Sequence, residues 1–163
     1  MTDRAVLVIG ADGLPQQLQS ADRIVVPISA NDIRNDTNGE GSAAIVIGAP
    51  VYTSAADTVK LAKANAKATS GVVGLGYDAT TAFSALGNIQ CSGVITATTA
   101  QWDAVITGGS GGLTFNTLYF LDPAAFGKLT ATPPTTVGQC NVLIGRGLSA
   151  TEMQLILNQP ILL

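Results

Sequence analysis

The chain has no histidine, two cysteines and two glutamates among its 163 residues. Without histidine, neither a Ser-His-Asp triad nor a Cys-His pair can form. Cys91 and Cys140 are isolated in apolar segments and cannot complete a usual structural zinc site by themselves. We interpret them as buried free thiols, with a disulfide as the alternative. A glycosidase pair would have to draw on scattered aspartates. These scarcities predict a protein that is not an enzyme and holds no cofactor or metal.

Charge is scarce as well. Charged residues make up 12% of the chain, about half the usual share, while hydrophobic residues make up 47%. The net charge of −3 and the scattered bases argue against a nucleic-acid partner. Apolar runs fall short of the ~18 residues that a membrane span needs. The apolar stretch after Met1 is too short for a signal peptide and lacks its cleavage site, so we expect none. We expect folding in a cytoplasm, and permanent burial of the charge-poor surface against other subunits.

What the sequence does contain is short apolar runs separated by Gly, Pro, Asn-Asp or Thr-rich pieces. This spacing predicts an all-β body, a small sandwich or barrel. The expected strands are Ala5–Ile9, Arg23–Ile28, Ala44–Ile47, Val51–Thr53, Thr58–Ala62, Val72–Leu75, Ile89–Ala97, Thr117–Leu121, Lys128–Thr132, Val142–Gly145 and Met153–Leu157.

Two segments favour helix. The alanines and lysines of Ser54–Ser70 favour it by propensity, but Val59 and Leu61 alternate with polar neighbours, so we predict a strand followed by a helical turn. Thr98–Ile106 is the one short helix we expect. Thr98 and Gln101 have the spacing of a capping box, and Trp102 lies on its apolar face.

The polar, turn-rich segment Ala30–Ser42 predicts a flexible hinge. We therefore divide the chain into an extended N-terminal arm with its hinge, residues 1–43, and a β-rich domain, residues 44–163. Within the hinge, Asp36, Asn38 and Glu40 alternate beside a glycine and could ligate calcium, although a solvated loop is the simpler interpretation.

Three glycine-containing stretches resemble nucleotide-binding motifs, and each fails. In "VLVIGADGLPQ", Asp12 stands where the second Rossmann glycine belongs. "GLGYDA" has no acidic residue about 20 positions further on to hold a ribose. In "DPAAFGKLT", Asp122 replaces the first P-loop glycine and Leu129 follows the lysine. We predict a surface turn, a glycine-bent strand and a β-hairpin for these stretches, in that order.

Residues 48–80, 88–105 and 111–163 together resemble a family of structural proteins of tailed bacteriophages. Its members are head-decoration (capsid cement) proteins, head fibres and some tail-fibre attachment modules. The resemblance is carried by "GLT", "LYFLDP", "GKLT", "TPPT", "GQ", "GRGLSAT" and "QPILL", in this order, with Gln159-Pro160 where two prolines are common in the family.

The resemblance implies an all-β body, oligomerisation as a homotrimer and no catalytic residue. It implies a virion protein that is made in the cytoplasm of the host bacterium. We expect a cement that binds the outside of the head and bridges subunits of the major capsid protein. A tail-fibre or head-fibre attachment or receptor-binding module is the alternative.

Two apolar stretches are candidates for the interface between subunits. "AVLVI" contains Val6, Leu7, Val8 and Ile9, which the expected hinge separates from the body, and an unpaired strand needs a partner. Ile161, Leu162 and Leu163 follow Pro160, which we expect to end any ladder of strand pairing. Burying each side chain would contribute roughly 1.5–3 kcal/mol. The alternative is that both stretches fold back onto their own sheet.

Overall fold

The computed structural model describes residues 7–9, 15–17 and 31–163. Five strands form a closed barrel in the order β3 (Ile33–Asn38), β6 (Thr58–Leu61), β5 (Pro50–Ala55), β7 (Val72–Gly76) and β9 (Leu86–Gln90). β3 runs parallel to β6 and antiparallel to β9, and the β3–β9 pairing closes the barrel. The prediction of an all-β fold is confirmed.

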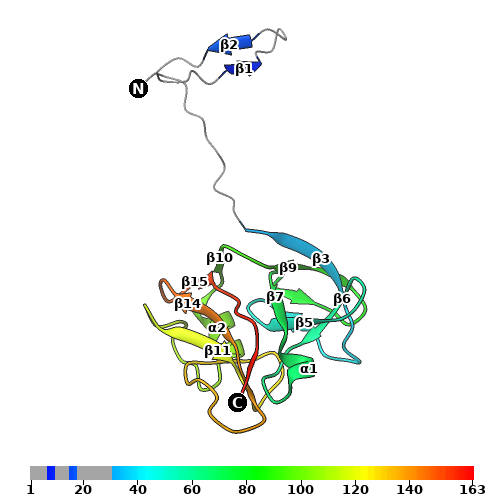
Figure 1. The fold of residues 1–163 in the computed structure, drawn as a ribbon, viewed down its shortest axis with the longest axis vertical. Coiled ribbons are helices and arrows are strands. Elements are labelled where there is room, and N and C mark those ends of the chain that lie inside the picture. Colours follow the sequence, from blue (N-terminus) through cyan, green and yellow to red (C-terminus); the bar gives the residue numbers. More distant parts are fainter. Residues whose placement is uncertain (1–6, 10–14, 18–30) are drawn as a thin grey trace.

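A second, antiparallel sheet lies beside the barrel (Figure 1). Its order is β10 (Val94–Thr96), β15 (Glu152–Leu155), β14 (Leu143–Gly147), β11 (Leu118–Leu121) and β12 (Leu129–Thr130). Three two-stranded sheets complete the strands described: β1 (Leu7–Ile9) with β2 (Pro15–Gln17), β4 (Ile45–Val46) with β8 (Thr80–Thr81), and β13 (Cys140–Asn141) with β16 (Ile161–Leu162). The helices are α1 (Lys67–Ser70) and α2 (Thr99–Val105).

The barrel and the five-stranded sheet share one hydrophobic core. Val59 and Ile89 from the barrel belong to the same buried cluster as Leu121 and Ile144 from the sheet. Glycines allow close backbone contact between the elements. A Cβ at Gly74 would lie 2.6 Å from the carbonyl oxygen of Gln90, which explains why this strand carries glycine.

Helix α2 confirms the expected helix and its cap. The Thr98 hydroxyl accepts from the Gln101 N–H at 3.2 Å, and the Gln101 carboxamide accepts from the Thr98 N–H at 2.8 Å. Trp102 is fully buried, and its indole N–H donates to the carbonyl of Thr151 at 3.0 Å. A Cβ at Gly48, before β5, would lie 2.8 Å from the Trp102 ring. Trp102 therefore packs between the two halves of the described body.

The prediction for Ser54–Ser70 is confirmed, because β6 is followed by the single helical turn α1. With this turn counted as α1, the described residues contain two helices. We expected one short helix, at Thr98–Ile106, besides the helical turn. The single strand expected over Ile89–Ala97 is two strands, β9 and β10. Gly93 separates them with φ of +87°, a left-handed conformation that L side chains rarely adopt.

The predicted β-hairpin after the glycine cluster is confirmed. β11 pairs antiparallel with β12, with Phe120 opposite Thr130. The Asp122 carboxylate organises the turn by accepting from the N–H groups of Ala124 and Ala125. Asp122 is buried and also accepts from the hydroxyl of Thr107. The glycines of this stretch therefore serve turns and connections.

The expectation of a flexible hinge over Ala30–Ser42 is wrong for its central part. Residues 33–38 are β3, which pairs with β6 and β9, so the barrel sheet crosses the predicted division at residue 43. The polar side chains of this segment form hydrogen bonds within the protein. Arg34 binds Asp36 through Nε–Oδ2 at 2.6 Å and Nη2–Oδ1 at 2.7 Å. The side-chain amide of Asn38 donates through Nδ2 to the carbonyls of Ala43 and Thr81.

Candidate interaction surfaces

The first candidate surface is the ribbon formed by β13 and β16. Cys140 lies opposite Leu162, and Asn141 lies opposite Ile161. The Leu163 N–H donates to the carbonyl of Gln139 at 2.9 Å, and its carbonyl accepts from the Gly138 N–H at 2.9 Å. Our expectation that Pro160 ends the strand ladder is therefore wrong. Proline is compatible with a position just before a strand, where no ladder hydrogen bond is required of it.

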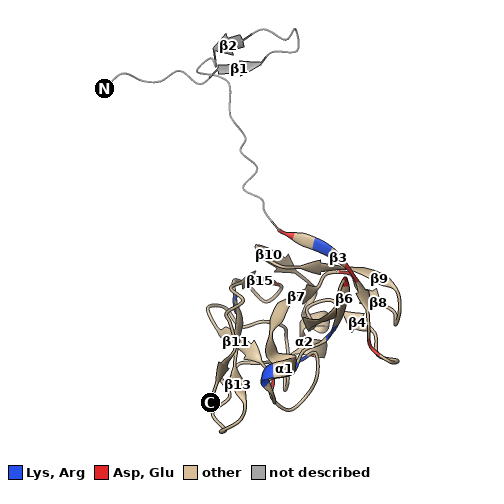
Figure 2. Ribbon diagram, turned by 45° about the vertical axis from the view of Figure 1, so that its right-hand side comes forward, with Lys and Arg blue, Asp and Glu red and all other residues tan. Residues whose placement is uncertain are grey.

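Pairing within the chain leaves the side chains of β16 exposed, whereas Cys140 on β13 is buried. Ile161 is 65% exposed and Leu162 60%, and Val137 in the adjoining turn is 88% exposed. Figure 2 shows the segment around β13 and the C mark without acidic or basic residues. These exposed aliphatic side chains make the ribbon a candidate for contact with another protein.

The second candidate surface is the outer side of the barrel, which we call the barrel face. It contains four exposed apolar side chains, Ile33, Tyr77, Phe83 and Leu86. Leu86 lies opposite Thr37 in the β3–β9 pair, and the Tyr77 N–H donates to the carbonyl of Asn88 on β9 at 2.9 Å. Ile33 lies opposite Gln90 at the other end of the β3–β9 pair, and Phe83 lies in the turn between β8 and β9.

Hydrogen bonds hold the barrel face in place. The turn that carries Phe83 is bound to β3 twice, because the Ser84 N–H donates to the Asn38 carbonyl and the Asn38 N–H donates to the Ala85 carbonyl. Ser84 has a φ of +59°, a left-handed conformation that costs energy for a residue with a side chain. A surface fixed before binding loses less conformational entropy when a partner covers it.

Asp78 and Asn88 cross-link the strands on this same side of the barrel, because Asn88 lies two residues after Leu86 on β9. The Asn88 N–H donates to Asp78 Oδ2 at 2.7 Å, and its side-chain amide donates to Oδ1 at 2.9 Å. These two hydrogen bonds lower the pKa of the Asp78 carboxyl below its ordinary value of 3.8. Asn35 donates in turn to Asn88 Oδ1 at 2.8 Å. The network links β3, β9 and the turn after β7.

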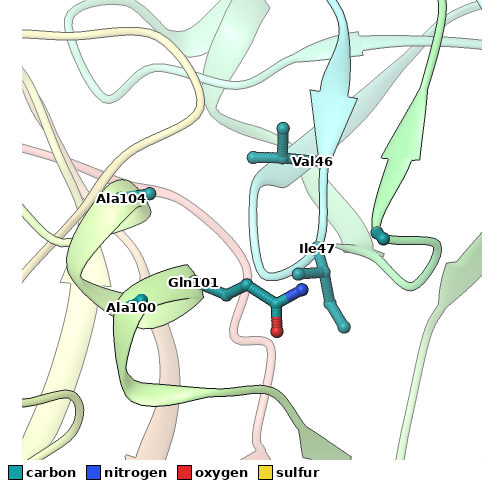
Figure 3. Close-up of a pocket in the computed structure, with 6 residues that line it drawn as sticks. Val46, Ile47, Ala100, Gln101 and Ala104 are labelled. Atoms are coloured by element: carbon teal, nitrogen blue, oxygen red, sulfur yellow. The ribbon is translucent and has the colours of Figure 1, made fainter.

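A small apolar cavity lies between α2 and β4 (Figure 3). Its volume is about 220 Å³. The Gln101 side chain extends across it toward Ile47 (Figure 3). Its other lining residues are small or aliphatic: Val46, Ala79, Ala100 and Ala104. A cavity lined in this way can take an apolar side chain, but no lining residue is charged, so it offers little chemistry for catalysis.

The residues that could have ligated calcium have partners within the protein. Asp36 forms an ion pair with Arg34. The hydrogen bond between these two side chains is the main reason why the pKa of the Arg34 guanidinium is raised. The Asn38 side-chain oxygen accepts from the Glu40 N–H, and Glu40 Oε1 accepts from the Leu61 N–H at 2.8 Å. In the part of the chain that the structure describes, no three acidic, cysteine or histidine residues form a group that could hold a metal ion.

Cys91 and Cys140 are both free thiols in the structure, so the alternative of a disulfide between them is wrong. Cys140 is buried, as expected, whereas Cys91 is only partly buried. The partial burial of Cys91 is the main reason why the pKa of its thiol is raised. Because the thiolate is the reactive form, a raised pKa makes Cys91 less nucleophilic. Among residues 7–9, 15–17 and 31–163, no helix is long and apolar enough to cross a membrane.

The predicted subunit-interface residues lie in two different sheets. Val6 lies outside the described residues, while Leu7, Val8 and Ile9 form β1 and pair with β2. Ile161 and Leu162 form β16, and Leu163 extends its pairing. Sequence reasoning missed the barrel face. The available signal was Phe83, a large aromatic residue between Ala82 and Ser84 in a short turn, where no apolar periodicity explains it.

Comparisons with family models, with curated proteins and with solved structures give no match to this chain.

Proposed function

We propose that the chain is a structural protein of a tailed bacteriophage, a homotrimer that decorates the outside of the head and bridges subunits of the major capsid protein. The sequence motifs of residues 111–163 support the phage assignment. The observation that carries a binding role is the barrel face, where Phe83 is 51% exposed on a hydrogen-bonded turn and Leu86 is 68% exposed at the start of β9. The proposal includes no catalytic, cofactor or metal site.

In this proposal the barrel face contacts the capsid. Burying a large apolar side chain contributes roughly 1.5–3 kcal/mol, and aromatic anchors commonly carry a large share of an interface's energy. A protein that binds only the assembled shell stabilises it by mass action, about 2.7 kcal/mol at a hundredfold excess over Kd. The stabilisation would therefore come from binding alone, without a chemical step.

The experiment is to add purified protein to phage heads that lack it and to measure the temperature at which they release DNA. We expect that temperature to rise with saturating protein. The variant Phe83→Ser/Leu86→Ser should bind heads with a Kd at least tenfold higher, since tenfold corresponds to about 1.4 kcal/mol. Phe126→Ser is the matched control, because Phe126 is also 51% exposed but lies in the β11–β12 turn.

Equal DNA release with and without the protein would show that the cement role is wrong. Equal binding by the double variant and the control would show that the barrel face is not the capsid contact. An electron-microscopy map of the intact virion locates the protein independently. Density for it on the tail or on a fibre would support the attachment-module alternative instead.

A further inference from the structure

The outer edge of β16 offers unpaired main-chain groups. In an antiparallel pair, successive residues point their N–H and C=O groups alternately toward and away from the partner strand. Leu163 uses both groups toward the β13 side, through Gln139 and Gly138. By alternation, the N–H and C=O of Leu162 point away from β13. No strand of the described residues pairs with that edge.

The surroundings of this edge favour an uncharged strand as its partner. From residue 129 to residue 163 the sequence contains only two charged residues, Arg146 and Glu152. The edge therefore lacks the lysines that commonly protect exposed edge strands from pairing. Ile161 and Leu162 are both exposed by 60% or more, so an incoming strand would bury apolar surface as well as form hydrogen bonds.

The two-stranded sheet of β1 and β2 also lacks a further strand beside it. Each of its strands has three residues, and among the described residues neither pairs with any other strand. An isolated two-stranded hairpin is at best marginally stable in water, and a third strand stabilises it. The residues of β1 are Leu7, Val8 and Ile9, and β2 is Pro-Gln-Gln, so the hairpin strands carry no charge. β1 has three residues and β16 has two, and both strands consist of aliphatic residues without charge.

We propose that β1 of one copy adds to the outer edge of β16 in a second copy and extends the β13–β16 ribbon to a third and fourth strand. This inference rests on the self-association in the proposed function and names its contact. It joins the two predicted interface stretches into a single interface. A contact between two different surfaces of the same chain is heterologous and closes into a ring when the rotation allows, which accommodates a trimer.

The chain length permits this reach. Thirteen residues, 18–30, connect Gln17 to Asn31. A chain of this length spans at most roughly 45 Å, about three times the ~15 Å radius of gyration expected for a domain of 163 residues. The β1–β2 hairpin of one subunit can therefore reach a neighbour without any displacement of the barrel.

Mixing two cysteine variants of the full chain tests the contact. Val8→Cys and Leu162→Cys, each in a Cys91→Ala/Cys140→Ala background because Cys140 lies opposite Leu162, are combined under denaturing conditions, refolded together and oxidised. We expect a covalent dimer of twice the 16.5 kDa chain mass that joins one variant to the other. Leu7→Cys is tested in parallel, because neighbouring side chains of a strand point to opposite faces. Leu118→Cys, exposed at the start of β11, replaces Leu162→Cys in the control mixture and should not cross-link.

A cross-link between two copies of Leu162→Cys would overturn the inference, because it would show that β16 pairs with β16. Equal cross-linking of the Leu118→Cys mixture, or no cross-linking at all, would overturn it too. Light scattering provides a second measurement without cysteines. The wild type should have a multiple of 16.5 kDa, and Leu162→Pro, which removes an outward N–H, should shift to the monomer mass.

Neither measurement involves phage heads. A monomeric wild type that still binds heads would overturn this inference and leave the decoration function standing. An oligomer that cross-links as expected but does not bind heads would do the reverse.

Discussion

The closed barrel and the β13–β16 ribbon differ in what happens to their strand edges. Every barrel strand has a neighbour on both sides, because β3 pairs with β9 as well as with β6. In the ribbon, β16 pairs on one side only within the described residues. Closure satisfies the main-chain groups internally, whereas an open edge is a template for another strand. The barrel therefore has no open edge, whereas the ribbon keeps one, which our inference assigns to association.

Two isoleucines, one on a barrel strand and one on the ribbon, illustrate this difference between the two regions. Ile89 on barrel strand β9 is 1% exposed, whereas Ile161 on β16 is 65% exposed. Equal side chains should therefore contribute unequally to the free energy of unfolding and, on our inference, unequally to association. Substitutions can break or sharpen this contrast.

The largest effect is expected from Trp102→Ala. Trp102 is fully buried between the barrel and the five-stranded sheet, so its removal leaves a cavity and an unused acceptor at Thr151. We expect the free energy of unfolding to fall by about 3–5 kcal/mol. Urea unfolding monitored by circular dichroism measures it, because the variant lacks the tryptophan signal. A loss below about 1 kcal/mol would show that α2 does not tie the two halves together.

Ile89→Ala should come next, with a loss of about 2–5 kcal/mol for a buried isoleucine. The loss arises inside the barrel, so the mass of the associated protein should not change while it remains folded. Chemical unfolding gives the stability, and light scattering gives the mass. Dissociation of a folded Ile89→Ala variant would contradict the separation of the closed barrel from the associating ribbon.

Acid should weaken the barrel face through Asp78. Its pKa is lowered in the folded state, mainly by hydrogen bonds from Asn88. Its stabilising contribution is therefore present above the ordinary value of 3.8 and is lost as the pH falls through the lowered folded value. Asp78→Asn should be less stable than the wild type at pH 7, and the gap should narrow toward pH 2. Urea titrations across that range test this, and a constant gap would refute it.

The smallest effect on stability is expected from Ile161→Ala. The side chain is mostly exposed, so the free energy of unfolding of the separate subunit should change by no more than about 0.5 kcal/mol. Association should weaken, because the interface loses apolar area. Unfolding at low protein concentration and light scattering at high concentration separate the two effects. A loss of several kcal/mol in the dilute protein would show that the ribbon is part of the core.

Local sequence patterns predicted much of the fold. The all-β class, helix α2 with its Thr98–Gln101 cap and the β11–β12 hairpin depend on neighbours a few residues apart, which the sequence displays directly. β3 was missed because its strand neighbours β6 and β9 are distant in sequence, and two of its asparagines have partners more than 40 positions away, Thr81 for Asn38 and Asn88 for Asn35. A polar strand inside a hydrogen-bonded network has the composition of a loop.

By itself, the sequence determined the period of the strands, the turns between them and the scarcity of groups able to do chemistry. Only the tertiary structure decided which strands closed into a barrel and which edge stayed open, because strand pairing joins segments that are distant along the chain. It also decided that Phe83 and Leu86 would be exposed, since burial depends on what other segments cover. Apolar residues in short runs can line a core or a binding surface, and long-range packing alone distinguishes the two.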